Sequence, residues 1–323
     1  MRQRLFYIDF LRGLSMFLIV MSHLSLFSFA LGDGPMIKYM IIPGLQLFMV
    51  ISGYFTNPEK INIVKRLKLL IPFLLFGGIY NYIYIGANLW EMMCEIAKNG
   101  YWFLWELVLF NIIVWFIHKC HIKLLYGFIS VEMISLILYF LFLRHTVIGN
   151  IIGLFYWCFL LPFFFGGIYL KQLGIEKLMK NKNWILLSCI CAVFLCCILR
   201  YYVFVEYWAV NITNMIMAFP TCLFLIMLTC TIESKLKGQM FMGKSLLKTI
   251  GSQIGRYTLE IYVLHYYIIY YIKLQKECNF LRENDLMWTE WIFSPIVAMV
   301  VIYLCISIAK LIEKLKVSFV FGK

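Results

Sequence analysis

The chain has 323 residues; 63% of them are hydrophobic, 14% are charged, and the formal net charge is +13. This apolar fraction is far above that of a soluble globular domain, which excludes a soluble protein and indicates an integral membrane protein. The positive charge does not indicate nucleic-acid binding, because the basic residues follow the pattern of loops between membrane spans.

Apolar runs near 20 residues long recur along the whole sequence, and this length is needed to cross about 30 Å of hydrocarbon. We therefore predict an all-α, polytopic membrane protein with about ten transmembrane helices in one bundle. Residues 1–323 would form a single integral membrane domain with no separate soluble domain. The predicted spans are residues 5–31, 36–55, 69–88, 101–117, 124–142, 148–170, 184–199, 207–232, 254–272 and 291–312.

The basic residues also predict the orientation of the chain. If both termini lie in the cytoplasm, the cytoplasmic segments hold about three times as many Lys and Arg residues as the outer segments, as the positive-inside rule expects. We therefore predict a multi-pass protein of the inner (cytoplasmic) membrane, embedded in the lipid bilayer, with both termini cytoplasmic.

The eleven cysteines do not have the spacing of a metal site or of a disulfide framework. Most of them lie inside the apolar spans, and paired C-x-x-C motifs of the kind that bind zinc do not occur. Cysteine in such a setting packs as a small apolar residue. We expect no metal ion.

The first span carries three polar residues, Asp9, Arg12 and His23. Each charged group in lipid costs about 2.5–3.5 kcal/mol on insertion scales, so such residues usually face a site or a polar path. Arg12 and His23 are eleven residues apart, which places them on one helical face and about 16 Å apart along the axis. A lone histidine can also serve only to bond a neighbouring helix, but this combination favours a catalytic site.

Several other residues have a structural interpretation, and for some of them a role in a site is the alternative. Lys65, Arg66 and Lys68 form a basic segment before the third span; it is either a topology signal or also a phosphate-binding segment. Ser52 and Gly53 either allow close helix packing or belong to a site. Trp102 is most simply part of an interfacial aromatic belt.

Two more candidates lie in later spans. Tyr262 and His265 share one face of the ninth predicted helix, so His265 is a second candidate site residue, with an interhelical hydrogen bond as the alternative. Glu106 has no basic residue near it in its own helix. It must therefore find a partner elsewhere, stay protonated or face a polar path.

Five short motifs, in this order along the chain, resemble those of the acyltransferase-3 family of bacterial membrane O-acyltransferases. They lie in the first span, at the end of the second, before the third, at the start of the fourth and in the ninth. The matching residues are Asp9, Arg12, Gly13 and His23; Phe48, Ser52, Gly53 and Tyr54; Lys65 and Lys68; Trp102, Phe103 and Leu104; and Gly255, Thr258, Leu259, Ile261, Tyr262 and His265.

The resemblance implies transfer of an acyl group, usually acetyl, from cytosolic acyl-CoA to a hydroxyl of a sugar in a cell-surface glycan or its lipid-linked precursor. No bound cofactor is implied, and acyl-CoA is a co-substrate. His23 would be the general base, a role that contributes about 10²–10⁴-fold to a rate; a transient acyl-histidine is the less favoured variant. Arg12 would hold Asp9 or a CoA phosphate.

The basic segment departs from the family, which usually has Arg-x-x-Arg where this chain has Lys65 and Lys68. Together with Arg66 these residues would attract the phosphates of CoA, but lysine lacks the bidentate fork of arginine. The alternative function is a transporter or flippase for a lipid-linked glycan, which would also bury ionisable groups in about ten helices. The sequence shows no inverted repeat of the kind found in many transporters.

Overall fold

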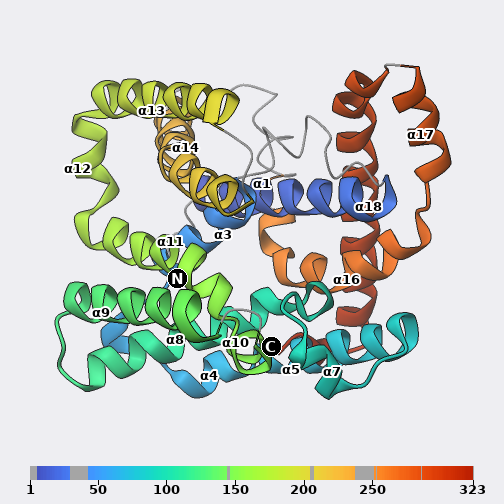
Figure 1. The fold of residues 1–323 in the computed structure, drawn as a ribbon, viewed down its shortest axis with the longest axis horizontal. Coiled ribbons are helices and arrows are strands. Elements are labelled where there is room, and N and C mark those ends of the chain that lie inside the picture. The colour runs from blue at the N-terminus through green and yellow to red at the C-terminus, as the bar shows by residue number, and fades with distance from the viewer. Residues whose placement is uncertain are drawn as a thin grey trace. The chain divides into compact units, whose positions relative to one another are not determined.

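The computed structural model describes residues 6–29, 43–143, 146–203, 207–236, 251, 253–284 and 286–322. Within these residues every regular element is a helix, which confirms the all-α prediction (Figure 1). The chain forms two compact units. Unit 1 comprises Met1–Ile51 and Lys171–Ala309, and unit 2 comprises Ser52–Leu170 and Lys310–Lys323. The single domain over residues 1–323 stays a prediction.

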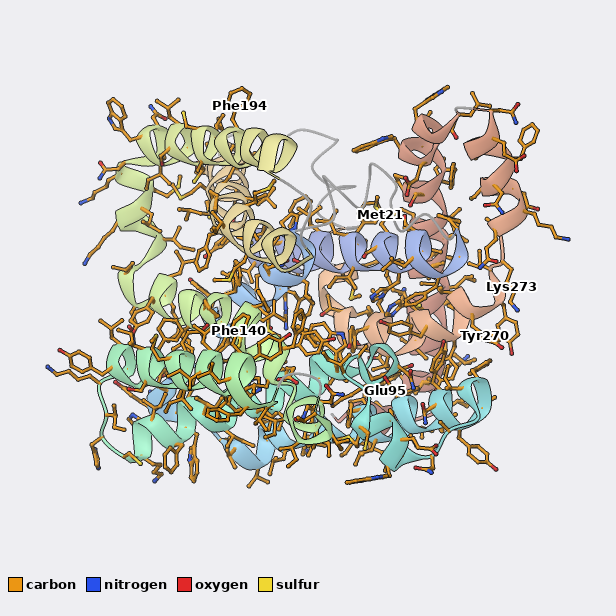
Figure 2. All side chains as sticks on the ribbon, in the orientation of Figure 1. Met21, Glu95, Phe140, Phe194, Tyr270 and Lys273 are labelled. Carbon is orange, nitrogen blue, oxygen red and sulfur yellow. The ribbon has the colours of Figure 1, made fainter. Side chains whose placement is uncertain are left out.

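Six helices in the described residues are long and apolar enough to cross a membrane. Large apolar side chains such as Phe194, 67% exposed, point outward from them and from neighbouring helices (Figure 2). The chain is therefore a multi-pass membrane protein. The six spans are Tyr7–Ser28, Trp102–Lys119, Leu124–Leu143, Val147–Leu173, Met215–Ser234 and Glu290–Lys314, which correspond to the first, fourth, fifth, sixth, eighth and tenth predicted spans.

The count of about ten spans is not confirmed, because the four remaining segments are shorter or interrupted in the described residues. The second predicted span begins outside these residues and continues as α3 (Pro43–Tyr54). The third is a run of short helices, α5 (Leu70–Pro72), η3 (Phe73–Gly77), α6 (Gly78–Tyr80) and η4 (Asn81–Ile85), of which two are π-helical.

The seventh and ninth predicted spans are helical, but the apolar stretches found among their described residues are shorter than a span. The seventh lies in α13 (Lys182–Val203), where the apolar stretch is Lys182–Ala192. The ninth is divided at Tyr257, whose backbone departs from helical geometry, so that α16 covers only Thr258–Tyr271.

In unit 1, α1 (Phe6–His23) packs against α14 (Tyr207–Leu236) and α16, and α13 lies beside α14 (Figure 1). Glycines bring α1 close to the segment before α16. A Cβ atom on Gly255 would overlap the carbonyl of Asp9, and one on Gly13 would lie 3.0 Å from the carbonyl of Gly251. Small residues allow membrane helices to approach in this way. Unit 1 also contains α12 (Ile175–Lys180), α17 (Gln275–Glu283), η7 (Met287–Thr289) and most of α18 (Glu290–Lys314).

Unit 2 is built around α8 (Trp102–Lys119), whose inner face is buried. Its C-terminal tail packs on the segment that follows the basic residues, since Phe321 stacks on Phe76 with ring centroids 5.4 Å apart. The other helices of this unit are η2 (Pro58–Lys60), α4 (Ile63–Leu67), α7 (Leu89–Cys94), η5 (Lys98–Gly100), α9 (Leu124–Ile137), η6 (Leu138–Leu143), α10 (Val147–Ile152), α11 (Leu154–Leu173) and η8 (Ser318–Phe321).

Candidate active site

His23 is the last residue of α1, and a π-helical turn, η1 (Leu24–Ser28), follows it directly. Single π-helical turns occur frequently at functional sites. Because α1 is continuous from Phe6, Arg12 lies on the same face as His23 but about 16 Å away along the axis. The imidazole and the polar pair Asp9 and Arg12 therefore occupy different levels of one helix.

The imidazole of His23 meets a second imidazole. Its Nδ1 atom lies 2.8 Å from Nε2 of His265 in α16. The two rings are inclined by only 9°, with centroids 5.0 Å apart. Rings stacked face to face are separated by more than the 2.8 Å between these two nitrogens. The two imidazoles therefore lie in nearly the same plane and meet edge to edge. This arrangement aims an N–H bond at a lone pair.

The hydrogen bond between His265 and the main-chain carbonyl of Ile261 shows which ring nitrogens of the two histidines carry hydrogen. Nδ1 of His265 lies 3.0 Å from the carbonyl oxygen of Ile261, which can only accept, so Nδ1 carries hydrogen. In a neutral ring Nε2 is then an acceptor, and His23 must donate to it from Nδ1. This leaves Nε2 of His23 without hydrogen. His265 therefore fixes His23 in the tautomer in which Nε2 can act as a base.

A hydroxyl already lies on that base nitrogen. The phenolic oxygen of Tyr266 is 3.1 Å from Nε2 of His23, and with the tautomer given above the hydroxyl is the donor. Tyr266 also packs on both imidazoles, with ring centroids 4.8 Å from His23 and 4.2 Å from His265. Three residues thus form one chain of hydrogen bonds, Tyr266 to His23 to His265, which ends at a main-chain carbonyl.

The middle member of this line of hydrogen bonds is the most exposed one. His265 is 0% and Tyr266 4% exposed, whereas His23 is only partly buried and touches Phe27, which is 56% exposed. A substrate therefore approaches this line of hydrogen bonds from the side of His23, where the Tyr266 hydroxyl contacts Nε2.

The turn after His23 is fixed to two other helices. The hydroxyl of Ser25 donates to the fully buried carboxyl of Glu290 in α18 at 2.7 Å. The hydroxyl of Ser28 donates to the carbonyl of Ile269 in α16 at 3.3 Å, and its own carbonyl accepts from the main-chain N–H of Leu274. These bonds hold the π-helical turn, and with it the imidazole of His23, against α16 and α18.

The first and fifth sequence motifs come together in this unit. Gly255 lies against the backbone of Asp9, and His265 lies against His23. Tyr262 is buried on the same helix, with its ring centroid 5.9 Å from that of His265. The structure therefore joins His23 with His265 and Tyr262, and it places Asp9 and Arg12 further along α1.

The basic segment belongs to unit 2. Lys65 and Arg66 lie in α4, which Asn62 caps by accepting from the main-chain N–H of Lys65 at 3.0 Å. The side chains of Lys65 and Lys68 are exposed, whereas Arg66 is half-buried, and its burial lowers the pKa of its guanidinium below the usual value. The segment thus presents two exposed lysine side chains beside a half-buried arginine.

The motif at the end of α3 has a structural role at Gly53. A Cβ atom there would overlap the carbonyl of Phe164 in α11, so only glycine allows this approach. One turn on, the hydroxyl of Thr56 donates to the carbonyl of Ser52 at 3.0 Å. Tyr54 is half-buried, and its ring meets that of Phe55 edge-on.

The aromatic residues at the start of α8 pack inside unit 2. Trp102 stacks in parallel on Tyr156 with centroids 3.6 Å apart, and Trp105 donates from Nε1 to the carbonyl of Ile151 at 2.9 Å. Tyr101 is fully buried. These contacts join α8 to the segment around α10, which gives Trp102 a packing role that the aromatic-belt interpretation did not include.

Glu106 is fully buried in α8, and its carboxyl lies against the backbone of Gly153. The charge that acts on it is that of Lys98, which is also fully buried. Lys98 donates from Nζ to the carbonyl of Asn150 at 2.7 Å. Burial lowers the pKa of Lys98, and the carboxylate of Glu106 opposes that shift. Glu106 thus lies in the field of a charge from another segment, while the described residues give its carboxyl oxygens no hydrogen-bond partner.

Tyr266 and Lys98 are the residues that the sequence did not single out. Tyr266 lies among Tyr267, Tyr270 and Tyr271, and such a run near a span end resembles an interfacial belt. Tyr270 does have that character, with Lys273 Nζ 5.2 Å from its ring centroid near the end of α16 (Figure 2). The one signal for Tyr266 is its position next to His265.

The fold and this site define a multi-pass membrane protein in which one histidine is hydrogen-bonded to a second histidine and to a tyrosine hydroxyl. The chain matches the acyltransferase domain, the acyltransferase-3 family, over residues 5–310. It therefore belongs to that family, whose members are generally membrane O-acyltransferases. No curated protein and no solved structure matches the chain.

Proposed function

We propose that the protein transfers an acyl group, acetyl in the first place, from acyl-CoA to a hydroxyl of a sugar in a cell-surface glycan or its lipid-linked precursor. It does so in the inner membrane, with both termini in the cytoplasm. The observation that carries the proposal is the acceptor nitrogen of His23, which His265 keeps free of hydrogen and beside which a hydroxyl lies 3.1 Å away.

The hydrogen-bond chain supports general base catalysis. A hydroxyl that donates to Nε2 of His23 gives up its proton there as its oxygen attacks the thioester carbonyl, and the same proton then passes to the sulfur of CoA. During this time His23 carries a positive charge. Its Nδ1–H continues to donate to His265, which stabilises the imidazolium in the way a third group supports a catalytic histidine.

Arg12 and the basic segment take binding roles in this proposal. Arg12 carries a fixed charge toward the other end of α1, for Asp9 or a CoA phosphate. Lys65, Arg66 and Lys68 attract the CoA phosphates from the cytoplasm, where exposed lysines act as mobile point charges. Tyr262 packs beside His265, Trp102 packs on Tyr156 in unit 2, and Ser52, Tyr54 and Glu106 remain candidate site residues of that unit.

The test replaces His23 by alanine and measures release of free CoA from acetyl-CoA in membranes supplied with a surface-glycan extract. We expect the rate to fall by about 10²–10⁴-fold at equal protein abundance. The matched control is His118→Ala, because His118 is an exposed histidine at the end of α8, and this variant should keep the wild-type rate.

Two results would overturn the proposal. Turnover that survives in His23→Ala would reduce His23 to a packing residue. Absence of CoA release from acetyl- or succinyl-CoA in the wild type, together with a defect in glycan export when the protein is deleted, would favour the transporter instead.

A further inference from the structure

We propose that Tyr266 carries the acyl group during the reaction, as a phenyl ester formed from acyl-CoA before the sugar is acylated. This inference rests on the proposed function and adds an intermediate to it. It starts from one contact: the hydroxyl that lies on the base nitrogen of His23 is a side chain of the protein itself.

The geometry is that of an activated nucleophile. Such a site needs a hydroxyl within about 2.6–3.2 Å of a base, and a third group that orients the base. Tyr266 lies 3.1 Å from Nε2 of His23, and His265 holds the opposite nitrogen at 2.8 Å. The described residues of unit 1 thus contain nucleophile, base and orienting group in one connected line.

The hydrogen bond from Tyr266 to His23 blocks direct transfer of the acyl group from CoA to the sugar. Acylation of Tyr266 removes this block. While the phenol donates to Nε2, a sugar hydroxyl cannot use that nitrogen. Once the phenolic oxygen is an ester it has no hydrogen to donate. Nε2 of His23 is then open, and it lies beside the acyl carbon that the sugar hydroxyl must attack.

The chemistry of the leaving groups favours a phenol as the intermediate carrier. A thiol has an ordinary pKa of about 8.5 and a phenol one of about 10, so exchange of an acyl group between them is nearly balanced. A phenyl ester therefore remains reactive enough to acylate an alcohol. An acyl group on His23 would occupy the base nitrogen that the second transfer needs, whereas Tyr266 leaves it available for both.

Both steps balance. In the first, the phenolic oxygen bonds to the acyl carbon, the carbon–sulfur bond breaks, and the phenolic proton passes through Nε2 of His23 to the sulfur, giving CoA. In the second, the sugar oxygen bonds to the same carbon, the bond to the Tyr266 oxygen breaks, and the sugar proton passes through Nε2 to that oxygen. No oxidant or further reactant is required.

The first measurement is isotope exchange between labelled free CoA and acetyl-CoA in the absence of any acceptor, with the purified full-length protein in detergent. An acyl-enzyme permits this exchange, and direct transfer does not. We expect exchange in the wild type and a fall of about 10²-fold or more in Tyr266→Phe. Tyr267→Phe changes the neighbouring tyrosine in the same way and should keep the exchange.

The second measurement locates the acyl group without a variant. The wild-type protein is incubated with labelled acetyl-CoA, denatured in acid and digested, and the peptides are weighed. We expect label on the peptide at Tyr266, and its removal by neutral hydroxylamine, which cleaves phenyl esters. This readout does not depend on the folding of a substituted protein.

The outcomes separate the inference from the proposed function. Turnover with an acceptor, but without exchange or label, would overturn the intermediate and leave the acyltransferase function standing. Label on a residue other than Tyr266 would overturn the assignment to this tyrosine. Absence of CoA release even with the glycan extract would remove the proposed function and this inference together.

Discussion

The two units bury ionisable side chains in opposite ways. In unit 1, the imidazole of His23 is held by other side chains that can exchange protons, and it reaches the surface beside Phe27. In unit 2, Lys98 is closed in and donates to a main-chain carbonyl, with Glu106 as its counter-charge. Burial of a charged residue in a membrane protein therefore does not by itself mark a site. What distinguishes His23 is an acceptor nitrogen that carries no hydrogen and already accepts from a hydroxyl, in a side chain that is only partly buried.

The largest effect on stability is expected in unit 2, where Lys98 and Glu106 are fully buried. Glu106→Gln removes the carboxyl whose charge acts on the buried ammonium of Lys98, and a buried charge left uncompensated costs about 3–5 kcal/mol of stability. We expect a strongly lowered unfolding temperature of the detergent-solubilised protein, measured by a fluorescence melt.

The double variant Lys98→Met with Glu106→Gln separates charge from packing. If the pair is held by its charges, this variant should melt close to the wild type, because neither charge is then left alone. A melt as low as that of Glu106→Gln would show that the effect of Glu106 does not depend on the charge of Lys98.

In unit 1 the corresponding change should alter rate more than stability. His265→Leu removes the acceptor that fixes the tautomer of His23, and we expect turnover to fall by about 10²-fold, or about 2.7 kcal/mol in the barrier. His265→Gln can still accept from Nδ1 of His23 through its amide oxygen and should lose less. Equal turnover in the two variants and the wild type would contradict the tautomer assignment.

The contrast also shows what the sequence could reveal. Polar residues inside an apolar span are visible as exceptions, which is why Asp9, Arg12, His23 and Glu106 were singled out. The motifs added His265, and the all-α class followed from composition. Pairing between distant segments was not accessible, because His23 and His265 are separated by 242 residues and no periodicity connects them.

Tyr266 and Lys98 were missed for different physical reasons. A tyrosine near the end of a span is usually part of the interfacial aromatic belt, and a lysine just before a span is usually a solvated charge. Two of the four unconfirmed spans depend on backbone geometry that hydropathy does not register, because the helical run over residues 70–85 is short and the ninth predicted span is interrupted at Tyr257. Backbone geometry of this kind depends on packing against other helices.

A smaller effect is expected at the turn that follows His23. Ser25→Ala leaves the buried carboxyl of Glu290 without this donor, and losing a hydrogen bond to a charged group costs about 1.5–3 kcal/mol. We expect a lower unfolding temperature together with a modest loss of turnover. Ser307→Ala, an exposed serine on α18 that bonds only its own helix, is the matched control. An unchanged melt in Ser25→Ala would show that the turn is held by its other contacts.

The smallest effect concerns the basic segment, and it decides between the two interpretations of Lys65 and Lys68. An exposed ion pair contributes about 0.2–1 kcal/mol, so each Lys→Gln change should raise KM for acetyl-CoA by up to about fivefold without changing kcat. Added salt should reduce the difference, because exposed charges are screened. Lys60→Gln, an exposed lysine in the same predicted cytoplasmic segment, alters topology signals equally but should leave KM unchanged. If all three variants behave alike, the segment orients the protein in the membrane and does not bind CoA; if only Lys65 and Lys68 respond, the two cations contact its phosphates although neither can grip them as an arginine would.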